Sequence, residues 1–152
     1  MSAAELRITY RPDDDGIGQI IATAQSGAFS AQGVAWFNPE HVKETFVANL
    51  RSFPFTSAKP PMIEGGFGSR ESGGLDECHL RIVIKPHNTR GTLLVCVDLA
   101  SESYRRAPDA DLQNCATIRF LTEYAIVEGF AQQFERVLDG DTEEAILKGI
   151  VS

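Results

Sequence analysis

The chain alternates apolar and polar positions over six stretches, and a period of two residues is typical of half-buried β-strands. In residues 76–85, Cys78 and Leu80 share the face that we expect to be buried, whereas His79 falls on the outward face. Turn-forming residues, such as those from Asp13 to Gly16, separate neighbouring stretches and favour antiparallel hairpins. The predicted strands are residues 6–11, 17–24, 28–37, 76–85, 92–100 and 114–121.

Two other stretches place their apolar side chains on one face of a helix. Asn38 and Pro39 begin the first, because asparagine caps free N–H groups and proline suits the first helical position. Its apolar positions are Val42, Phe46, Leu50 and Phe53. The second begins after Thr122, the expected N-cap, and ends at Gly140, which tolerates the left-handed conformation of a helix end. Its apolar positions are Ile126, Val127, Phe130, Phe134, Val137 and Leu138.

The order of these elements predicts an α+β fold in a single domain over residues 1–152. We expect one antiparallel sheet of about six strands with two main helices, followed by a short C-terminal helix. Asp141 and Thr142 offer caps for this last helix. Its apolar positions would be Ala145, Ile146 and Ile150. Residues 54–75 are rich in Gly and Pro and predict a long irregular loop. Met62, Ile63 and Phe67 would allow a short edge strand within it.

Composition and charge exclude several classes of protein. The 152 residues are 43% hydrophobic and 23% charged, and no apolar run is long enough to span a membrane. The first residues lack a basic segment followed by an apolar one, so we expect no signal peptide and a cytoplasmic location. The net charge of −7 argues against nucleic acid or an anionic membrane as partner, because both require clustered Lys and Arg.

The side chains that carry chemistry match no metal-binding pattern. Cys78, Cys96 and Cys115 are odd in number and widely spaced, so we expect free thiols buried in strands rather than disulfides or a zinc site. A calcium loop beginning at Asp13 would need a glutamate at its twelfth position, where the chain has Ala24. We therefore predict no metal and no cofactor.

No catalytic residue is predicted either. The glycines at positions 65, 66 and 68 are not followed by the Lys and Ser/Thr of a phosphate-binding loop, and we expect a flexible surface loop there. His41 and His87 fall at positions expected to be solvated. The remaining enzymatic possibility is a cleft that uses Asp98 or His79 on the outer face of the sheet.

Negative charge is concentrated at the C-terminal end of the chain. Residues 122–152 contain seven acids and two bases, and so carry −5 of the net charge of −7. An acidic helical face of this kind is usually a solvated surface, but it can also steer a basic protein partner. The candidate partner-binding residues are Glu128, Glu135, Asp139, Asp141, Glu143 and Glu144.

The order of several segments resembles a family of small bacterial proteins. Trp36 and Phe37 end the first group of predicted strands. Residues 80–84 and 91–95 form two segments with the alternating pattern of strands, and residues 118–123 lead into a Phe-rich helix. Over residues 29–138 this looks like the WapI-type immunity proteins of polymorphic toxin systems. The resemblance implies a protein that neutralises a cognate toxin by binding it, without catalysis or a cofactor. The Gly-rich loop and residues 141–152 depart from that family.

The sequence thus predicts a protein-binding module, with the acidic helical face or the outer sheet face meeting a partner, and leaves its oligomeric state open. The alternative is a small-molecule-binding or enzymatic α+β domain with a pocket between the sheet and the 54–75 loop. A ligand-binding domain should enclose a cavity of about 300 Å³ or more with converging polar groups. An immunity-like protein should instead present a flat or convex acidic surface.

Overall fold

A computed structural model describes residues 4–68, 75–102 and 112–150 of the chain. The strands are β1 (Glu5–Pro12), β2 (Gly18–Ser26), β3 (Phe29–Phe37), β4 (Met62–Gly68), β5 (Leu75–Pro86), β6 (Thr92–Ala100), β7 (Cys115–Glu123) and β8 (Glu144–Lys148). The first helix comprises α1 (Pro39–Val42), one π-helical segment (Lys43–Val47) and α2 (Ala48–Leu50), and the second is α3 (Tyr124–Leu138). None of the described helices is long and apolar enough to cross a membrane.

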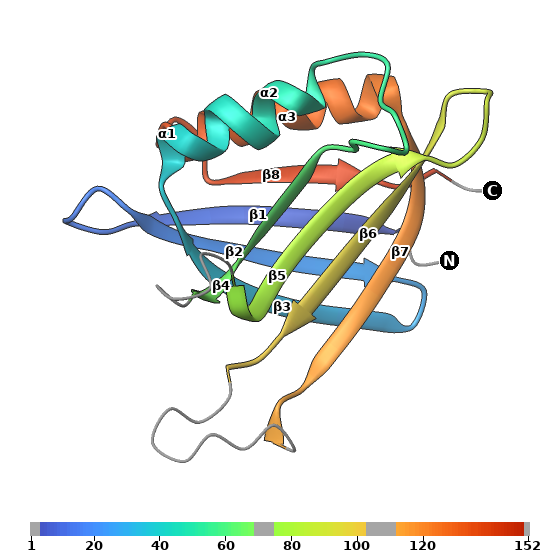
Figure 1. The fold of residues 1–152 in the computed structure, drawn as a ribbon. Helices are drawn as coiled ribbons and strands as arrows, with labels where there is room; N and C mark the ends of the chain where they lie inside the picture. Colours follow the sequence, from blue (N-terminus) through green and yellow to red (C-terminus); the bar gives the residue numbers. More distant parts are fainter. Residues whose placement is uncertain (1–3, 69–74, 103–111, 151–152) are drawn as a thin grey trace.

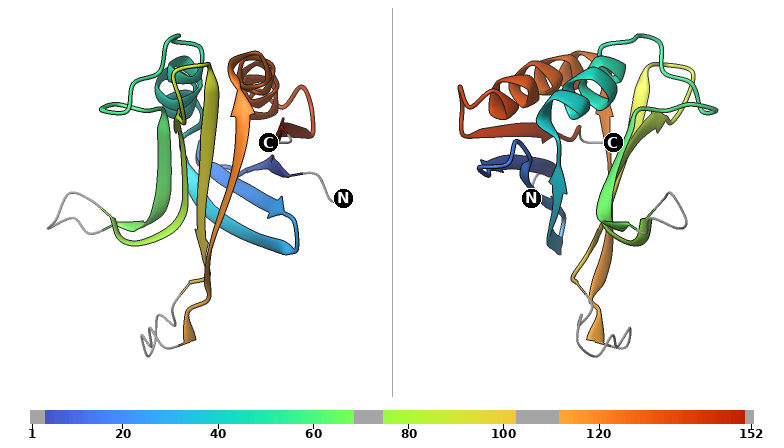
Figure 2. Two further views of the ribbon diagram at one scale, coloured as in Figure 1. Left: turned by 90° about the vertical axis from the view of Figure 1, so that its right-hand side faces the viewer. Right: turned by 60° about the vertical axis from the view of Figure 1, so that its left-hand side comes forward.

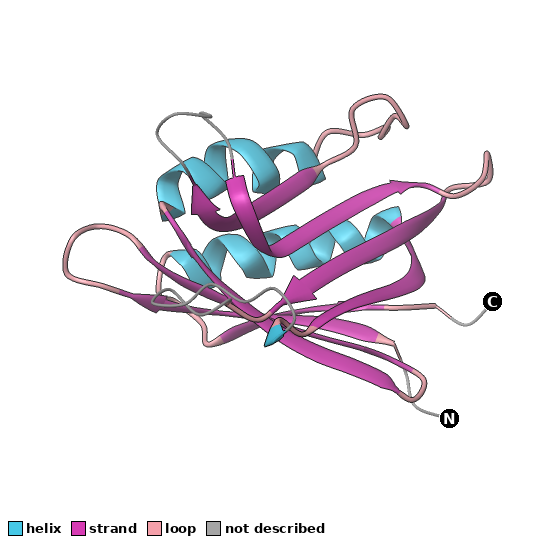
Figure 3. Ribbon diagram, turned by 60° about the horizontal axis from the view of Figure 1, so that its bottom comes forward, coloured by secondary structure: helices cyan, strands magenta, loops and turns pink. Residues whose placement is uncertain are grey.

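The strands form two antiparallel sheets of four strands rather than the single sheet of about six predicted from the sequence. The first sheet has the order β3-β2-β1-β8 and the second the order β4-β5-β6-β7. The α+β class is confirmed, but alternation alone cannot show which strands share a sheet. The two sheets cross at an angle (Figures 1 and 3), and the two helices lie side by side over one end of them (Figure 2).

The predicted C-terminal helix is wrong, because residues 144–148 form strand β8. Its register with β1 pairs Leu147 with Leu6, and both side chains are fully buried. Ala145 and Leu147 alternate with more exposed neighbours, which is the period of a strand. Pairing with β8 gives hydrogen-bond partners to the backbone N–H and C=O groups on the side of β1 that faces away from β2. An isolated one-turn helix would leave these groups of β1 without partners.

Helix α3 begins one residue later than predicted. Thr122 belongs to β7, is fully buried and donates a hydrogen bond through Oγ1 to the carbonyl oxygen of Lys148 at 2.9 Å. The extended residue before the helix is Glu123, and it makes no side-chain capping bond. At the other end, Gly140 has a φ of +81°, so the predicted helix end is confirmed.

The helices pack on the core through the apolar stripes predicted for them. Phe46 of the first helix meets Phe134 of α3 edge to face at 6.0 Å between ring centroids, and Phe130 lies against the same ring. Val42 and Leu50 are buried as expected. Phe53, which the pattern assigned to the same stripe, is 74% exposed because α2 ends at Leu50.

Glycines allow the two sheets to approach each other closely. A Cβ atom at Gly33 of β3 would lie 2.8 Å from the carbonyl oxygen of His79, which belongs to the second sheet. At Gly65 of β4 it would lie 2.4 Å from the ring of Phe37. The Gly-rich segment expected to be a surface loop is therefore partly strand β4, and the short edge strand around Met62 is confirmed.

A bulge reverses the predicted faces of two residues in β5. The register pairs Gly65 with Leu80 but Gly66 with Cys78, so His79 is an extra residue in the ladder. As a result His79 is buried at 2% exposure and Cys78 is exposed, the opposite of the alternation pattern. Cys115 is also exposed and Cys96 half-buried, which corrects the expectation that all three thiols are buried.

Candidate functional site

The six predicted partner-binding acids lie along α3, its C-terminal turn and β8, and we call them the acidic surface. Glu128 and Glu135 point toward the first helix, where Arg51 lies 3.7 Å and 3.2 Å from their respective carboxylate oxygens. In β8, Glu144 lies 3.4 Å from the guanidinium group of Arg7. These exposed pairs each contribute about 0–1 kcal/mol, but they neutralise charge within the molecule.

Lys43 neutralises a further member of the acidic surface. Its ammonium group donates a hydrogen bond to Asp139 at 2.5 Å and lies 2.8 Å from Glu40. The hydrogen bonds to Asp139 and then Glu40 hold the pKa of Lys43 well above its usual value. Only Asp141 and Glu143 of the acidic surface form no ion pair within the described residues.

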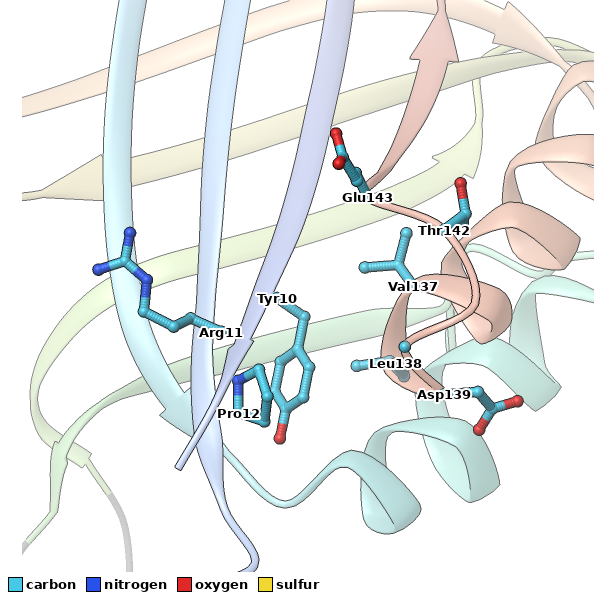
Figure 4. Close-up of a pocket in the computed structure, with 9 residues that line it drawn as sticks. Tyr10, Arg11, Pro12, Val137, Leu138, Asp139, Thr142 and Glu143 are labelled. Carbon is cyan, nitrogen blue, oxygen red and sulfur yellow. The ribbon is translucent and has the colours of Figure 1, made fainter. Parts of the chain in front are cut away.

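A groove of about 750 Å³ runs between the end of β1 and the turn that links α3 to β8. Figure 4 shows Tyr10 and Pro12 on one wall and Val137 and Leu138 on the other, with Arg11 pointing away from Tyr10. Burial raises the pKa of the Tyr10 phenol. The groove combines an apolar floor with acids at one rim, so it has room for a ligand but offers few converging polar groups.

The two residues proposed for an outer-face cleft are not brought together. His79 is buried against Phe67, and its Nε2 donates to Glu77 Oε1 at 2.7 Å. Gln113 donates to the same carboxylate oxygen at 3.3 Å and to a backbone carbonyl at 2.8 Å. Asp98 accepts from Thr117 Oγ1 at 2.6 Å across the strands of the sheet. The inward turn of His79 at the bulge therefore separates it from Asp98.

The pocket expected beside the 54–75 loop is a small aromatic hollow of about 250 Å³. Phe53 and Phe55 meet Tyr124 edge to face at 4.8 Å and 5.0 Å, and the Phe55 amide donates to the Tyr124 hydroxyl at 3.1 Å. The hollow continues to the hairpin between β5 and β6. Residues 69–74 of the predicted loop lie outside the described residues.

The outer face of the first sheet offers a different surface along β2 and β3. Its outward-facing residues on these two strands are Gln19, Ile21, Thr23, Gln25, Ser30, Gln32, Val34 and Trp36. None of these eight side chains is charged, and we call them the neutral face. Ile21 pairs with Val34, and Gln19 pairs with Trp36, which is 46% exposed. Arg11 of β1 completes the row beyond Gln19.

The neutral face had a sequence signal that the alternation pattern obscured. Residues 16–39 contain no Asp, Glu, Lys or Arg, although 23% of the chain is charged. A strand with one solvated face normally alternates apolar inward positions with polar outward positions. The outward positions here carry amides, hydroxyls and apolar groups but no charge.

Metal-binding chemistry is not assembled in the part of the chain that the structure describes, which contains no group of three or more His, Cys, Asp or Glu suited to a metal ion. The surfaces that stand out are the neutral face, the groove beside Tyr10 and the acidic surface. Comparisons with protein-family models, with curated proteins and with solved structures gave no match for this chain.

Proposed function

We propose that this chain is a protein-binding module whose neutral face contacts the partner. The observation that carries the proposal is the complete lack of charge on the eight outward side chains of β2 and β3 in a protein of net charge −7. The cores of protein interfaces are depleted in charged residues and enriched in aromatic residues. A solvated sheet face has no comparable reason to exclude charge.

The row formed by Trp36, Gln19 and Arg11 has the composition of an interface centre. Trp and Arg are over-represented among the residues that contribute most to binding energy. Trp36 is half exposed on a rigid strand, so little conformational entropy is lost when a partner covers it. Arg11 forms no ion pair within the described residues and is available to a carboxylate of the partner.

The acidic surface supports the proposal less well. Glu128, Glu135, Asp139 and Glu144 already have cationic neighbours, so within the described part of the chain only Asp141 and Glu143 remain to attract a basic partner. A toxin domain, which the resemblance to immunity proteins suggests, is one partner of the proposed kind. We place the acidic surface at the rim of such a complex, where charges steer association more than they add affinity.

Site-specific photo-crosslinking tests where the partner binds. A photoreactive residue at Thr23, on the neutral face, should capture one protein in cells of the native host, and the same residue at Glu135 should not. With the captured protein purified, we expect Trp36→Ala to weaken its binding by about 10–100-fold, the loss typical of an interface hot spot. Calorimetric titration measures this loss.

Two control variants accompany Trp36→Ala. Phe53→Ala removes a more exposed aromatic ring that does not belong to the neutral face, and Glu143→Lys reverses a charge of the acidic surface. Both should change the dissociation constant by less than about threefold at physiological salt, because rim charges are screened. Loss of binding in Glu143→Lys with normal binding of Trp36→Ala would move the site to the acidic surface.

The groove beside Tyr10 favours a second candidate function, the binding of a small molecule with an apolar body. Its volume of about 750 Å³ is within the range of ligand sites, although it is open and its polar groups do not converge. Screening a fragment library by methyl NMR tests this candidate. Shifts confined to Val137 and Leu138, reproduced by one chemical class, would support it; an absence of such shifts would reject it.

A further inference from the structure

The four edge strands of the two sheets differ in how they are protected. Edge strands avoid unwanted pairing by being short, charged or bulged. In β4 the register shifts twice, and β8 has only five residues, with Glu144 and Lys148 at its ends. The edge of β7 is joined to the segment after β8 through a hydrogen bond from the Ile150 amide to the carbonyl of Leu121.

Strand β3 has none of these protections. It contains nine residues, all uncharged and none proline, and it pairs with β2 in an unbroken register from Ser26–Phe29 to Gly18–Phe37. A long, regular and uncharged edge is either an aggregation hazard or a docking site for another strand.

The hairpin between β2 and β3 shows which backbone groups face the open edge. Ser26 and Phe29 close a two-residue turn, in which the closing pair exchanges both backbone hydrogen bonds. Bonded and non-bonded pairs then alternate along the strand. The N–H and C=O groups of Ser30, Gln32 and Val34 therefore point away from β2. No hydrogen bond within the described residues occupies them.

Two recesses lie directly beside these backbone groups. Their volumes are about 290 Å³ and 320 Å³, and both include Gln32 in their lining. One wall is β3 from residue 30 to residue 34, and the opposite wall is formed by the ends of β6 and β7, which β3 crosses in Figure 1. Five extended residues span about 17 Å, the length of an average strand.

We propose that an extended segment of a partner protein adds to the free edge of β3 as a fifth strand of the first sheet. The proposal rests on the protein-binding function and specifies how the partner docks. Among the described residues that line the two recesses, Glu102 is the only charged one. A complementary segment is therefore uncharged along β3, carries no acid, and has a Lys or Arg at the end that meets Glu102. Its backbone pairs with Ser30, Gln32 and Val34.

A second copy of the chain is a less suitable occupant. Antiparallel pairing of two β3 strands would bring together two molecules of net charge −7. The wall formed by Ala100, Ser101 and Glu102 stands beside the same edge in each copy. Charge and space thus favour a single strand of opposite or neutral charge.

A pair of substitutions at one position separates the edge from the face. Gln32→Pro removes one N–H from the free edge and leaves the bonds to β2 in place, whereas Gln32→Ala removes only the side chain from the neutral face. Nine-residue peptides selected from a displayed random library on the wild-type chain serve as the probe, and fluorescence anisotropy measures their binding. We expect Gln32→Pro to weaken binding at least about tenfold, and Gln32→Ala, which keeps the backbone N–H, to weaken it several-fold less than Gln32→Pro does.

The selected peptides should carry β-branched residues at alternate positions and should lack Asp and Glu. They should bind the Glu102→Gln variant several-fold more weakly than the wild-type chain at low salt. Circular dichroism confirms that Gln32→Pro folds, and Ser30→Pro is the second variant that removes an edge donor. Equal peptide binding by folded Gln32→Pro and Ser30→Pro, or no enriched peptide, would overturn strand addition. A wild-type dimer in ultracentrifugation that Gln32→Pro dissociates would also overturn it, in favour of a second copy.

The photo-crosslinked partner distinguishes this proposal from the function on which it rests. If its binding depends on Trp36 but not on the Gln32 amide, the protein-binding function stands and strand addition falls. If neither substitution affects binding, strand addition and the assignment of the neutral face as the binding site both fall.

Discussion

The acidic surface and the neutral face differ in the number of charged side chains that they carry. The acidic surface carries most of the net charge of the chain, yet four of its six acids face Lys43, Arg51 or Arg7 in the folded molecule. The neutral face carries no charge at all, and its Trp36 is 46% exposed. A concentration of charge in a sequence therefore need not mark a partner site, whereas its removal from an exposed face needs an explanation.

The largest expected effect concerns the core on which the acidic surface is built. Phe130 lies beneath this surface at 1% exposure and packs against Phe134. Phe130→Ala should lower the free energy of unfolding by about 3–5 kcal/mol, because truncation leaves a cavity. Thr23→Ala on the neutral face should change it by less than about 0.5 kcal/mol. Urea denaturation measures both; wild-type stability of Phe130→Ala would mean that α3 does not pack as described.

One glycine substitution in β3, which carries part of the neutral face, is compared with one in α3, which carries part of the acidic surface. Gly33→Ala in β3 should cost about 1–3 kcal/mol, because the new Cβ would meet the His79 carbonyl and Leu99 at 2.8 Å. Gly129→Ala in α3 meets no atom within 4 Å and should add about 0.5–1 kcal/mol through higher helix propensity. Thermal unfolding should shift in opposite directions. Equal shifts would show that β3 does not lie against the second sheet.

The smallest effect tests whether the acidic surface is neutralised internally. The pKa of Lys43 is raised in the folded protein, so its stabilising contribution is fully present below about pH 10, near the unfolded pKa, and is lost as the pH rises through the folded pKa. We expect Lys43→Met to be less stable than wild type by at most about 1 kcal/mol at neutral pH. The difference should shrink above pH 10. A difference that does not change with pH would exclude the ion pair as its cause.

Much of the local structure follows from the sequence because it depends on near neighbours. The strand around residues 6–11 and the capped helix start at Asn38 were predicted, as was the helix end at Gly140. Alternation, capping and glycine conformation are properties of a few consecutive residues. The class of fold follows from the same signals, and so does the short strand at Met62.

The candidate site was only partly predictable. The outer sheet face was one of two surfaces expected to meet a partner, and the charge-free residues 16–39 were visible in the sequence. The pattern did not show which of the strands lies at an edge, because strand order depends on pairing between residues far apart in the chain. The ion pairs that neutralise Glu135 and Asp139 likewise join residues 84 and 96 positions apart.

The sequence by itself determined the α+β class, most element positions and the uncharged composition of β2 and β3. Tertiary structure alone decided that residues 144–148 pair with β1 instead of forming a helix, and that a bulge turns His79 inward. It also placed β3 at an edge of the first sheet, with no further described strand paired to it. Local signals specify the backbone state of short segments, but whether a hydrogen-bonding edge is filled depends on which distant segment reaches it.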